Sequence, residues 1–305
     1  MRHLIVPEDL NAHEIEAVFA VSRDLEEKYD AGRRDALLPG RVLGLVFEKP
    51  SLRTRVSFEA AMVHLGGSSI FLGEDAGFSS SRESIADFGR VLSEYVDVIV
   101  CRSKAHASIE QLAAAASVPV INGLSDYCHP CQALADIYTL KAHVGRVAGH
   151  TLAFVGDGNN MARSLAVLCG LLGMRFVLAA PPAYQFDEAF RRHLKTILPN
   201  AEIEETTDPV AAVTGAAVVY TDVWTSMGQE RERERRLTDL RPYQVNGALM
   251  QRCPDALFMH CLPARRGEEV TDEVIDGPQS VVVEEAANRM HVQKGLLAWL
   301  LGPQK

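Results

Sequence analysis

Short apolar runs alternate with segments of helical periodicity along almost the whole chain. The first series of apolar runs falls at residues 42–47, 69–72, 96–101 and 118–121, and the second at 151–156, 175–179, 216–220, 256–260 and 281–283. Helical periodicity is seen at 13–28, 54–65, 84–95, 108–116, 131–143, 160–172, 187–197, 229–237 and 286–301. The alternation predicts an α/β fold in which helices cover parallel sheets. Gly145 and Gly149 separate the two series, so we expect two domains that divide between residues 140 and 150.

The composition is that of an ordinary globular protein. The 305 residues are 47% apolar and 23% charged, which suits two domains of usual size. A net charge of -9 argues against a general nucleic-acid or membrane surface. No apolar run reaches the ~18 residues of a membrane span, and the N-terminus lacks the apolar core of a secretory signal. Six dispersed cysteines in or beside apolar segments favour a reducing cytoplasm over a disulfide scaffold.

The strongest chemical feature is a turn rich in cations and hydroxyls after the run 42–47. Ser51, Arg53, Thr54 and Arg55 stand where the next helix is expected to begin. The first N–H groups of a helix lack intrahelical partners and carry the positive end of its dipole. Backbone donors, hydroxyls and guanidinium groups that meet at one point suit a phosphate better than a neutral ligand. We therefore interpret this turn as an anion site.

Polar residues also follow the ends of other predicted strands, where ligands collect in α/β sheets. Arg102 follows the run 96–101, and Asp222 follows the run 216–220 at a place that suits an ammonium group. Adjacent His260 and Cys261 end a later run, but neighbouring side chains on a strand point to opposite faces and do not readily form a nucleophile pair.

The segment 128–132 permits more than one interpretation. Cys128 and Cys131 form the Cys-x-x-Cys pair of thiol oxidoreductases, yet the pair ends a four-strand unit instead of opening a small domain. Zinc is a weaker interpretation, since no second Cys/His pair at ligand spacing completes a site. His129 and Gln132 instead stand at a loop-to-helix junction, where an imidazole N–H and an amide can polarise a carbonyl oxygen. We favour this last interpretation.

Three further patterns carry weaker signals. Gly156-Asp157-Gly158 suggests a dinucleotide loop, but Met161 replaces the third glycine and no acidic residue ends the next run, so no nicotinamide cofactor is expected. The run 231–236 mixes Arg and Glu and is interpreted as a solvated helix face. The Gly- and Ser-rich stretch 73–82 fits either a mobile lid or an inert loop.

Five stretches, in this order, resemble the aspartate and ornithine carbamoyltransferase family. They are Ser51-Leu52-Arg53-Thr54-Arg55, His129-Pro130-Cys131-Gln132, Asp157-Gly158-Asn159-Asn160, the segment 222–228, and His260-Cys261-Leu262-Pro263. The resemblance spans residues 47 to 289. Leu52 departs from the family, which usually has Thr at this point, so one hydroxyl is lost while the backbone N–H remains. The segment Asp-x-x-x-Ser-Met-Gly and the sequence His-Cys-Leu-Pro are those of the ornithine type.

This resemblance implies a fold and a set of site residues. It implies two doubly wound parallel-sheet domains: residues 1–145 bind carbamoyl phosphate, with a helix at 286–302 packing back on them, and residues 146–285 bind ornithine. It assigns carbamoyl phosphate to Ser51, Leu52, Arg53, Thr54, Arg102, His129, Gln132, Cys261, Leu262 and Arg289. It assigns ornithine to Asn160, Asp222, Ser226 and Met227, and catalysis to Arg102, His129, Asp222 and Cys261. No metal or organic cofactor is implied.

The activity implied is transfer of a carbamoyl group from carbamoyl phosphate to the δ-amine of L-ornithine, as in arginine biosynthesis. The resemblance also implies a cytoplasmic homotrimer with shared active sites, and no nucleic-acid or membrane partner. Within the family the alternatives are another acceptor (an N-acylornithine, putrescine or aspartate) or a member without catalytic activity. A thiol oxidoreductase built on Cys128 is the alternative from another class.

Overall fold

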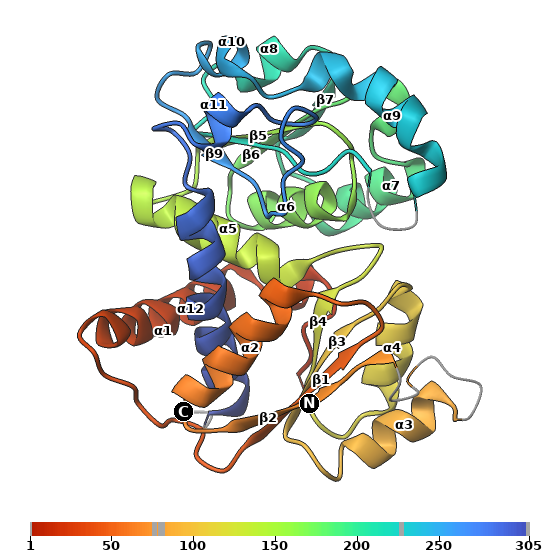
Figure 1. Cartoon of the computed structure of the whole chain (residues 1–305), viewed down its shortest axis with the longest axis vertical. Coiled ribbons are helices and arrows are strands. Elements are labelled where there is room, and N and C mark those ends of the chain that lie inside the picture. The colour runs from red at the N-terminus through yellow and green to blue at the C-terminus, as the bar shows by residue number, and fades with distance from the viewer. Residues whose placement is uncertain (1, 75–77, 79–82, 226–228, 303–305) are drawn as a thin grey trace. The chain divides into compact units, whose positions relative to one another are not determined.

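The computed structural model describes residues 2–74, 78, 83–225 and 229–302. Its contacts divide the chain into two compact units, shown in Figure 1. Unit 1 comprises Met1–Tyr138 with Ala287–Lys305, and unit 2 comprises Thr139–Ala286. The ligand assigned to each domain, and the boundary expected at residues 145 and 146, stay predictions. Among the described residues, no helix has both the length and the apolar character needed to span a membrane.

Unit 1 is built on a four-stranded parallel sheet in the order β2-β1-β3-β4. Its strands are β1 (Val42–Phe47), β2 (Ser68–Leu72), β3 (Val98–Arg102) and β4 (Val120–Leu124). Its helices are α1 (Ala12–Asp30), α2 (Leu52–His64), α3 (Ile85–Leu92), α4 (His106–Ala115) and the first part of α5 (Pro130–Val144), after the 3-10 turn η1 (Pro7–Asp9). In Figure 1, α3 and α4 lie on one side of this sheet and α2 on the other. The chain order reverses between neighbouring β1 and β3, so the loops after these strands meet at the position where α/β sheets bind ligands.

Unit 2 is built on a five-stranded parallel sheet in the order β7-β6-β5-β8-β9. Its strands are β5 (Thr151–Val155), β6 (Arg175–Ala179), β7 (Ile203–Thr206), β8 (Val218–Tyr220) and β9 (Leu257–Met259). Its helices include α6 (Asn160–Leu171), α7 (Glu188–Ile197), α8 (Pro209–Val213), α9 (Arg233–Leu240), α10 (Gly247–Met250) and α11 (Asp272–Ile275), with short 3-10 turns η3 (Pro182–Tyr184), η4 (Glu230–Glu232) and η5 (Arg241–Tyr243). In Figure 1, α6 and α7 cover one face and α8, α10 and α11 the other. Here the order reverses between β5 and β8.

The expected α/β fold with two parallel sheets is confirmed, but one predicted strand is wrong and one strand was not predicted. The run 281–283 was expected as a strand, whereas α12 (Val282–Leu301) begins there and only Ser280 pairs, with Phe258. Three consecutive valines fit a strand or the start of a helix equally well by local pattern. Val283 is 77% exposed, which a residue of a central strand would not be. Strand β7 was missed because its sequence, Ile-Glu-Glu-Thr, lacks the apolar run of a central strand and lies at the sheet edge.

Candidate active site

The predicted anion turn lies between β1 and α2 in unit 1. Ser51 is the N-cap of α2, and its hydroxyl accepts a hydrogen bond of 3.4 Å from the backbone N–H of Thr54. Leu52 is the first helical residue and is 77% exposed, while Arg53 is half-buried. Arg55 lies elsewhere: it forms an ion pair with Glu59 on the surface of the helix. The cap thus orients the first turn of α2. Of the four residues named in the sequence, Ser51 is the N-cap and Arg53 and Thr54 lie in that first turn, whereas Arg55 does not take part.

The hydroxyl of Thr54 is a meeting point for two arginines. Arg102, the last residue of β3, donates from Nη1 to Thr54 Oγ1 over 3.4 Å. Arg289, on α12, donates from Nη2 to the same oxygen over 2.8 Å. All three side chains are buried. Two guanidinium groups on one hydroxyl concentrate positive charge beside the helix N-terminus, which is the electrostatic requirement of a phosphate site.

His129 lies in the same electrostatic environment and precedes α5. Burial, and after it the positive charges of Arg289 and Arg102, hold the pKa of His129 well below its ordinary value. The imidazole is therefore neutral at physiological pH and offers one N–H donor. A neutral donor among arginines can polarise a carbonyl oxygen without adding a further charge to a buried site.

Gln132 has a partner that the sequence did not predict. Its Nε2 donates to Asp136 Oδ1 over 2.7 Å, and both side chains are buried. The two residues are four apart on α5, so they occupy the same helix face. This spacing was the available signal, since a carboxylate four residues after a candidate ligand-binding amide can fix its orientation.

A second unpredicted residue, Glu48, organises the loop that follows Arg102. Its carboxylate accepts hydrogen bonds from the hydroxyl of Ser103 and, over 2.7 Å, from the backbone N–H of Lys104. Its own N–H donates to the carbonyl of Arg102 over 2.9 Å. Glu48 therefore connects the ends of β1 and β3 at the reversal point of the sheet.

The Cys-x-x-Cys segment does not have the features of a redox site. Cys128 donates to the carbonyl of Ile5 and Cys131 to the carbonyl of Asn122, each over 3.4 Å, and both thiols are buried. Burial raises the pKa of Cys131 to about 12 and raises that of Cys128 further from its ordinary value. Reactive thiols require a lowered pKa and access to solvent, so these two cysteines are structural.

In unit 2, the turn after β5 is joined to the loop after β8. Asn159 caps α6, where its Oδ1 accepts from the N–H groups of Met161 and Ala162 over 2.9 and 3.1 Å. Its Nδ2 donates to Asp222 Oδ2 over 2.8 Å. Asn160, which the resemblance assigns to ornithine, is the half-buried first residue of α6. The first asparagine thus holds Asp222, a contact that the sequence did not predict.

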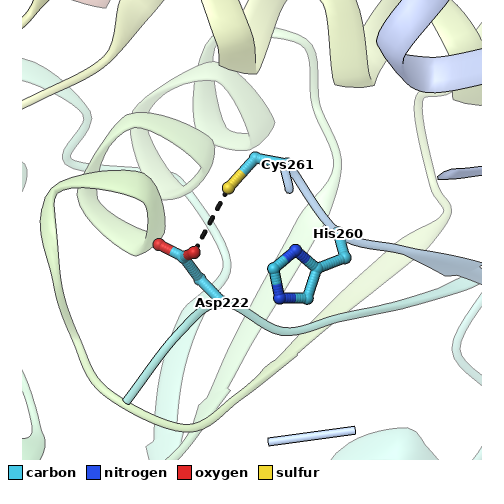
Figure 2. Close-up of side chains that lie close together, drawn as sticks. All are labelled: Asp222, His260 and Cys261. Carbon is cyan, nitrogen blue, oxygen red and sulfur yellow. Dashed lines mark hydrogen bonds between the residues drawn. The ribbon is translucent and has the colours of Figure 1, made fainter. Parts of the chain in front are cut away.

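Asp222 also bonds Cys261, which follows β9 (Figure 2). Cys261 Sγ donates to Asp222 Oδ1 over 3.2 Å, and the N–H of Val223 donates to the same oxygen over 2.8 Å. With Asn159, the carboxylate has three donors that fix its orientation. Ser226 and Met227, assigned to ornithine by the resemblance, lie outside the described residues, as does most of the stretch 73–82.

His260 supports the turn that carries Cys261 and Leu262. Its Nδ1 accepts from the N–H of Leu262 over 2.9 Å, which leaves Nε2 as the donor to Glu269 Oε1 at 3.2 Å. Leu262 has a φ of 55°, in the left-handed region, so this bond stabilises a conformation that a leucine rarely adopts. Cys261 and Leu262 belong to unit 2, although the resemblance assigns them to carbamoyl phosphate together with residues of unit 1.

Asp222, His260 and Cys261 also lie close enough to consider a metal ion, since their ligand atoms are within 4.8 Å of one another (Figure 2). However, both imidazole nitrogens of His260 already form hydrogen bonds, and coordination would break one of them. The arrangement therefore fits a hydrogen-bonded group of side chains better than a preformed metal centre.

The turn after β5 does not have the space of a dinucleotide loop. The N–H of Gly158 donates to the carbonyl of Tyr184 over 2.7 Å, and a Cβ on Gly158 would lie 2.9 Å from that oxygen. The glycine thus permits close approach of another protein segment, where a dinucleotide loop would admit a pyrophosphate.

Comparisons with known proteins cover both units. Residues 2–142 match the family model described as Aspartate/ornithine carbamoyltransferase, carbamoyl-P binding domain, and residues 148–300 match its Asp/Orn binding domain. Ornithine carbamoyltransferase of Pyrococcus abyssi is 49% identical over 100% of this chain and 97% of its own length; that of Bacillus subtilis is 45% identical over 98% and 94%. The solved structure of ornithine carbamoyltransferase from Pyrococcus furiosus has a TM-score of 0.95 at 47% identity, covering 100% of this chain and 98% of that one.

Proposed function

The chain belongs to the aspartate/ornithine carbamoyltransferase family, and from that premise we propose that it transfers the carbamoyl group of carbamoyl phosphate to the δ-amine of L-ornithine. The products are L-citrulline and phosphate. The observation that carries the proposal is the convergence of Arg102 and Arg289 on Thr54, in a chain whose full-length relatives are named ornithine carbamoyltransferases. A relative from Pyrococcus furiosus is named anabolic, which fits citrulline formation for arginine biosynthesis.

Unit 1 is assigned the binding of carbamoyl phosphate, with one group of residues for its phosphate and another for its carbonyl oxygen. Ser51, Leu52 and Arg53 bind the phosphate with the first N–H groups of α2. Thr54, Arg102 and His129 donate to the carbonyl oxygen, where negative charge develops as the amine attacks. Supporting this, His129 is a neutral donor beside two cations. Gln132 and Arg289 complete the set, and Cys261 and Leu262 of unit 2 join it by the family resemblance.

Ornithine is assigned to unit 2. Asp222 orients an amino group of ornithine, and the carboxylate of Asp222 is itself held by hydrogen bonds from Asn159 and Cys261. By resemblance, Asn160 is assigned to the α-carboxylate, and Ser226 and Met227 to holding ornithine. The δ-amine attacks as the neutral amine, although an unperturbed amine of this kind has a pKa near ~10.4. The departing phosphate accepts the proton, so the reaction balances without a metal or an organic cofactor, and orientation and electrostatics supply the rate gain.

The test is an acceptor panel with purified protein and carbamoyl phosphate. L-ornithine is expected to give citrulline at a rate far above that with N-acetylornithine, N-succinylornithine, putrescine or aspartate. A faster rate with one of these would reassign the acceptor within the family. Binding of carbamoyl phosphate with no product from any acceptor would identify a non-catalytic member. Cys128→Ala is expected to keep full transferase activity, because this buried thiol is structural.

We also propose that the chain works as a homotrimer in the cytoplasm. Support for association is an exposed apolar stripe on α2, formed by Leu52, Val56 and Val63. Exposed apolar stripes of this kind favour contact with another protein surface. Support for the cytoplasm is that all six cysteines are free thiols. Light scattering should give three times the mass of one chain, and a monomer would contradict the assignment.

A further inference from the structure

The charged run 231–236 contains one residue that is not on a solvated helix face. Arg236, on α9, is 8% exposed, whereas its neighbour Arg235 is exposed and pairs with Glu232 one turn earlier. The sequence interpretation of the run as a solvated face is therefore wrong at this position. A buried guanidinium requires specific partners. The Nε of Arg236 donates to Glu232 in the same charged run over 3.2 Å, and the partners of its Nη1 come from the two loops assigned to ornithine.

Arg236 joins these two loops through one nitrogen. Its Nη1 donates to Asp157 Oδ2 over 2.7 Å and to the carbonyl of Trp224 over 3.1 Å. Asp157 opens the turn that continues through Asn159, the residue that holds Asp222. Trp224 lies two residues after Asp222 and two before Ser226 in the sequence. The two bonds therefore fix the distance between the turn after β5 and the loop after β8.

A second connection runs from α9 to the same turn. Tyr184 donates from its hydroxyl to Asp239 on α9 over 2.8 Å, and its carbonyl accepts from the N–H of Gly158 over 2.7 Å. The guanidinium of Arg236 lies 5.1 Å from the ring centroid of Tyr184. Helix α9 thus contacts the turn directly through Arg236 and indirectly through Tyr184, which makes it a support for the turn.

The pair formed by Arg236 and Asp157 is nearly dry. The side chains are 9% and 12% exposed. Burial raises the pKa of Asp157 above its ordinary value, and the charge of Arg236 opposes that rise. Removing the arginine alone would leave the buried carboxylate of Asp157 without its main counter-charge. Either the turn would then move or Asp157 would take up a proton.

We propose that Arg236 is a positioning residue for ornithine binding, which holds the turn 157–160 and the segment 222–225 at the separation that the amino acid requires. The assignment rests on the proposed function, because it presumes that these two loops bind ornithine. It predicts a selective effect: loss of Arg236 weakens ornithine binding and leaves carbamoyl phosphate binding, most of whose assigned residues lie in unit 1, largely unchanged.

The experiment compares Arg236→Gln with Arg235→Gln, a matched change one residue away on the exposed face. Steady-state kinetics are measured for each substrate with the other saturating. For Arg236→Gln we expect the KM for ornithine to rise about tenfold or more, with the KM for carbamoyl phosphate within about twofold of wild type. Arg235→Gln is expected to match wild type in both. An unchanged ornithine KM in Arg236→Gln, or an equal rise for both substrates, overturns the proposal.

The double variant Arg236→Gln/Asp157→Asn keeps the test decisive if the single variant does not fold. It removes the buried carboxylate together with its partner, so no buried charge is left uncompensated. It is expected to show the same selective rise in ornithine KM. A wild-type KM in the double variant, or failure of both variants to fold, assigns Arg236 to stability and overturns the proposal. If wild-type protein forms no citrulline at all, the proposed function itself has failed, which is a different outcome.

Discussion

Arg289 donates a hydrogen bond of 2.8 Å to the hydroxyl of Thr54, across 235 positions of the sequence. The last helix thereby supplies a side chain to the turn that opens α2. Because Arg102 donates to the same oxygen, the hydroxyl of Thr54 on α2 receives bonds from two cations, one from β3 and one from α12. Such a hydroxyl positions both guanidinium groups at once.

Thr54→Val is the sharpest test of that relationship, since valine keeps the shape of threonine and removes the hydroxyl, which accepts from the two arginines and is proposed to donate to the ligand. A hydrogen bond to a charged group contributes about 1.5–3 kcal/mol, so we expect carbamoyl phosphate to bind about 10- to 100-fold more weakly. Isothermal titration measures the change. Thr196→Val, at an exposed position on α7, is the matched control. Unchanged affinity in Thr54→Val would show that the two arginines need no acceptor at this point.

Arg53→Ala should damage carbamoyl phosphate binding far more than Leu52→Thr improves it. Arg53 brings a charge to the first turn of α2, whereas the side chain of Leu52 is 77% exposed and the hydroxyls of Ser51 and Thr54 remain. We expect a loss of about tenfold or more for Arg53→Ala and a change of less than about twofold for Leu52→Thr. Titration of both variants in parallel decides, and effects of equal size would overturn this ranking.

Folding stability should fall as the pH drops below 6.5. Burial, and after it the charge of Lys294, lowers the pKa of His291 from 6.5 to about 4, and the pKa of His129 is lowered as well. The unfolded chain therefore binds more protons than the folded chain within this window, so stability is complete above pH 6.5 and is lost toward pH 4. For His291 alone the loss is roughly 2–3 kcal/mol.

Urea unfolding between pH 7.5 and 4.5 measures this slope. His291→Asn removes one titrating group, and its slope should be visibly shallower than that of wild type. His13→Asn, at an exposed position on α1, is the control and should keep the wild-type slope. Equal slopes for wild type and His291→Asn would mean that the pKa of His291 is the same in the folded and the unfolded chain.

The sequence predicted the residues that lie at strand and helix ends, because their place follows from local pattern. Ser51 caps α2 and Arg102 ends β3, as the alternation of apolar runs implies. It did not predict roles that depend on a distant partner. Arg236 looks like any member of a charged run until Asp157, 79 residues away, is placed against it. The strand predicted at the valines 281–283 was wrong because the local pattern itself was ambiguous: a short apolar run fits a strand or a helix equally well.

Asp136 is a partner of this kind, because it orients the side-chain amide of Gln132, a residue assigned to carbamoyl phosphate. The Nε2 of Gln132 donates one hydrogen bond to Asp136, so the amide oxygen faces away from that carboxylate. An amide oxygen can accept from the NH2 of a carbamoyl group, but it has nothing to accept from the methyl of acetyl phosphate. If Gln132 contacts the carbamoyl group as proposed, Asp136 would fix which end of the amide the ligand meets, and with it a preference for carbamoyl phosphate over acetyl phosphate.

Asp136→Asn should lower that preference. Asparagine can donate as well as accept, so the Gln132 amide is free to turn and present Nε2 to the ligand. We expect the ratio of the affinities for carbamoyl phosphate and acetyl phosphate, measured by titration of each, to fall about tenfold, the effect of one lost specific hydrogen bond. Asp24→Asn, at an exposed i,i+4 pair on α1, is the control and should leave the ratio unchanged. A general disruption of the site would weaken both ligands equally and keep the ratio constant, so a constant ratio in Asp136→Asn would remove Asp136 from the determinants of specificity.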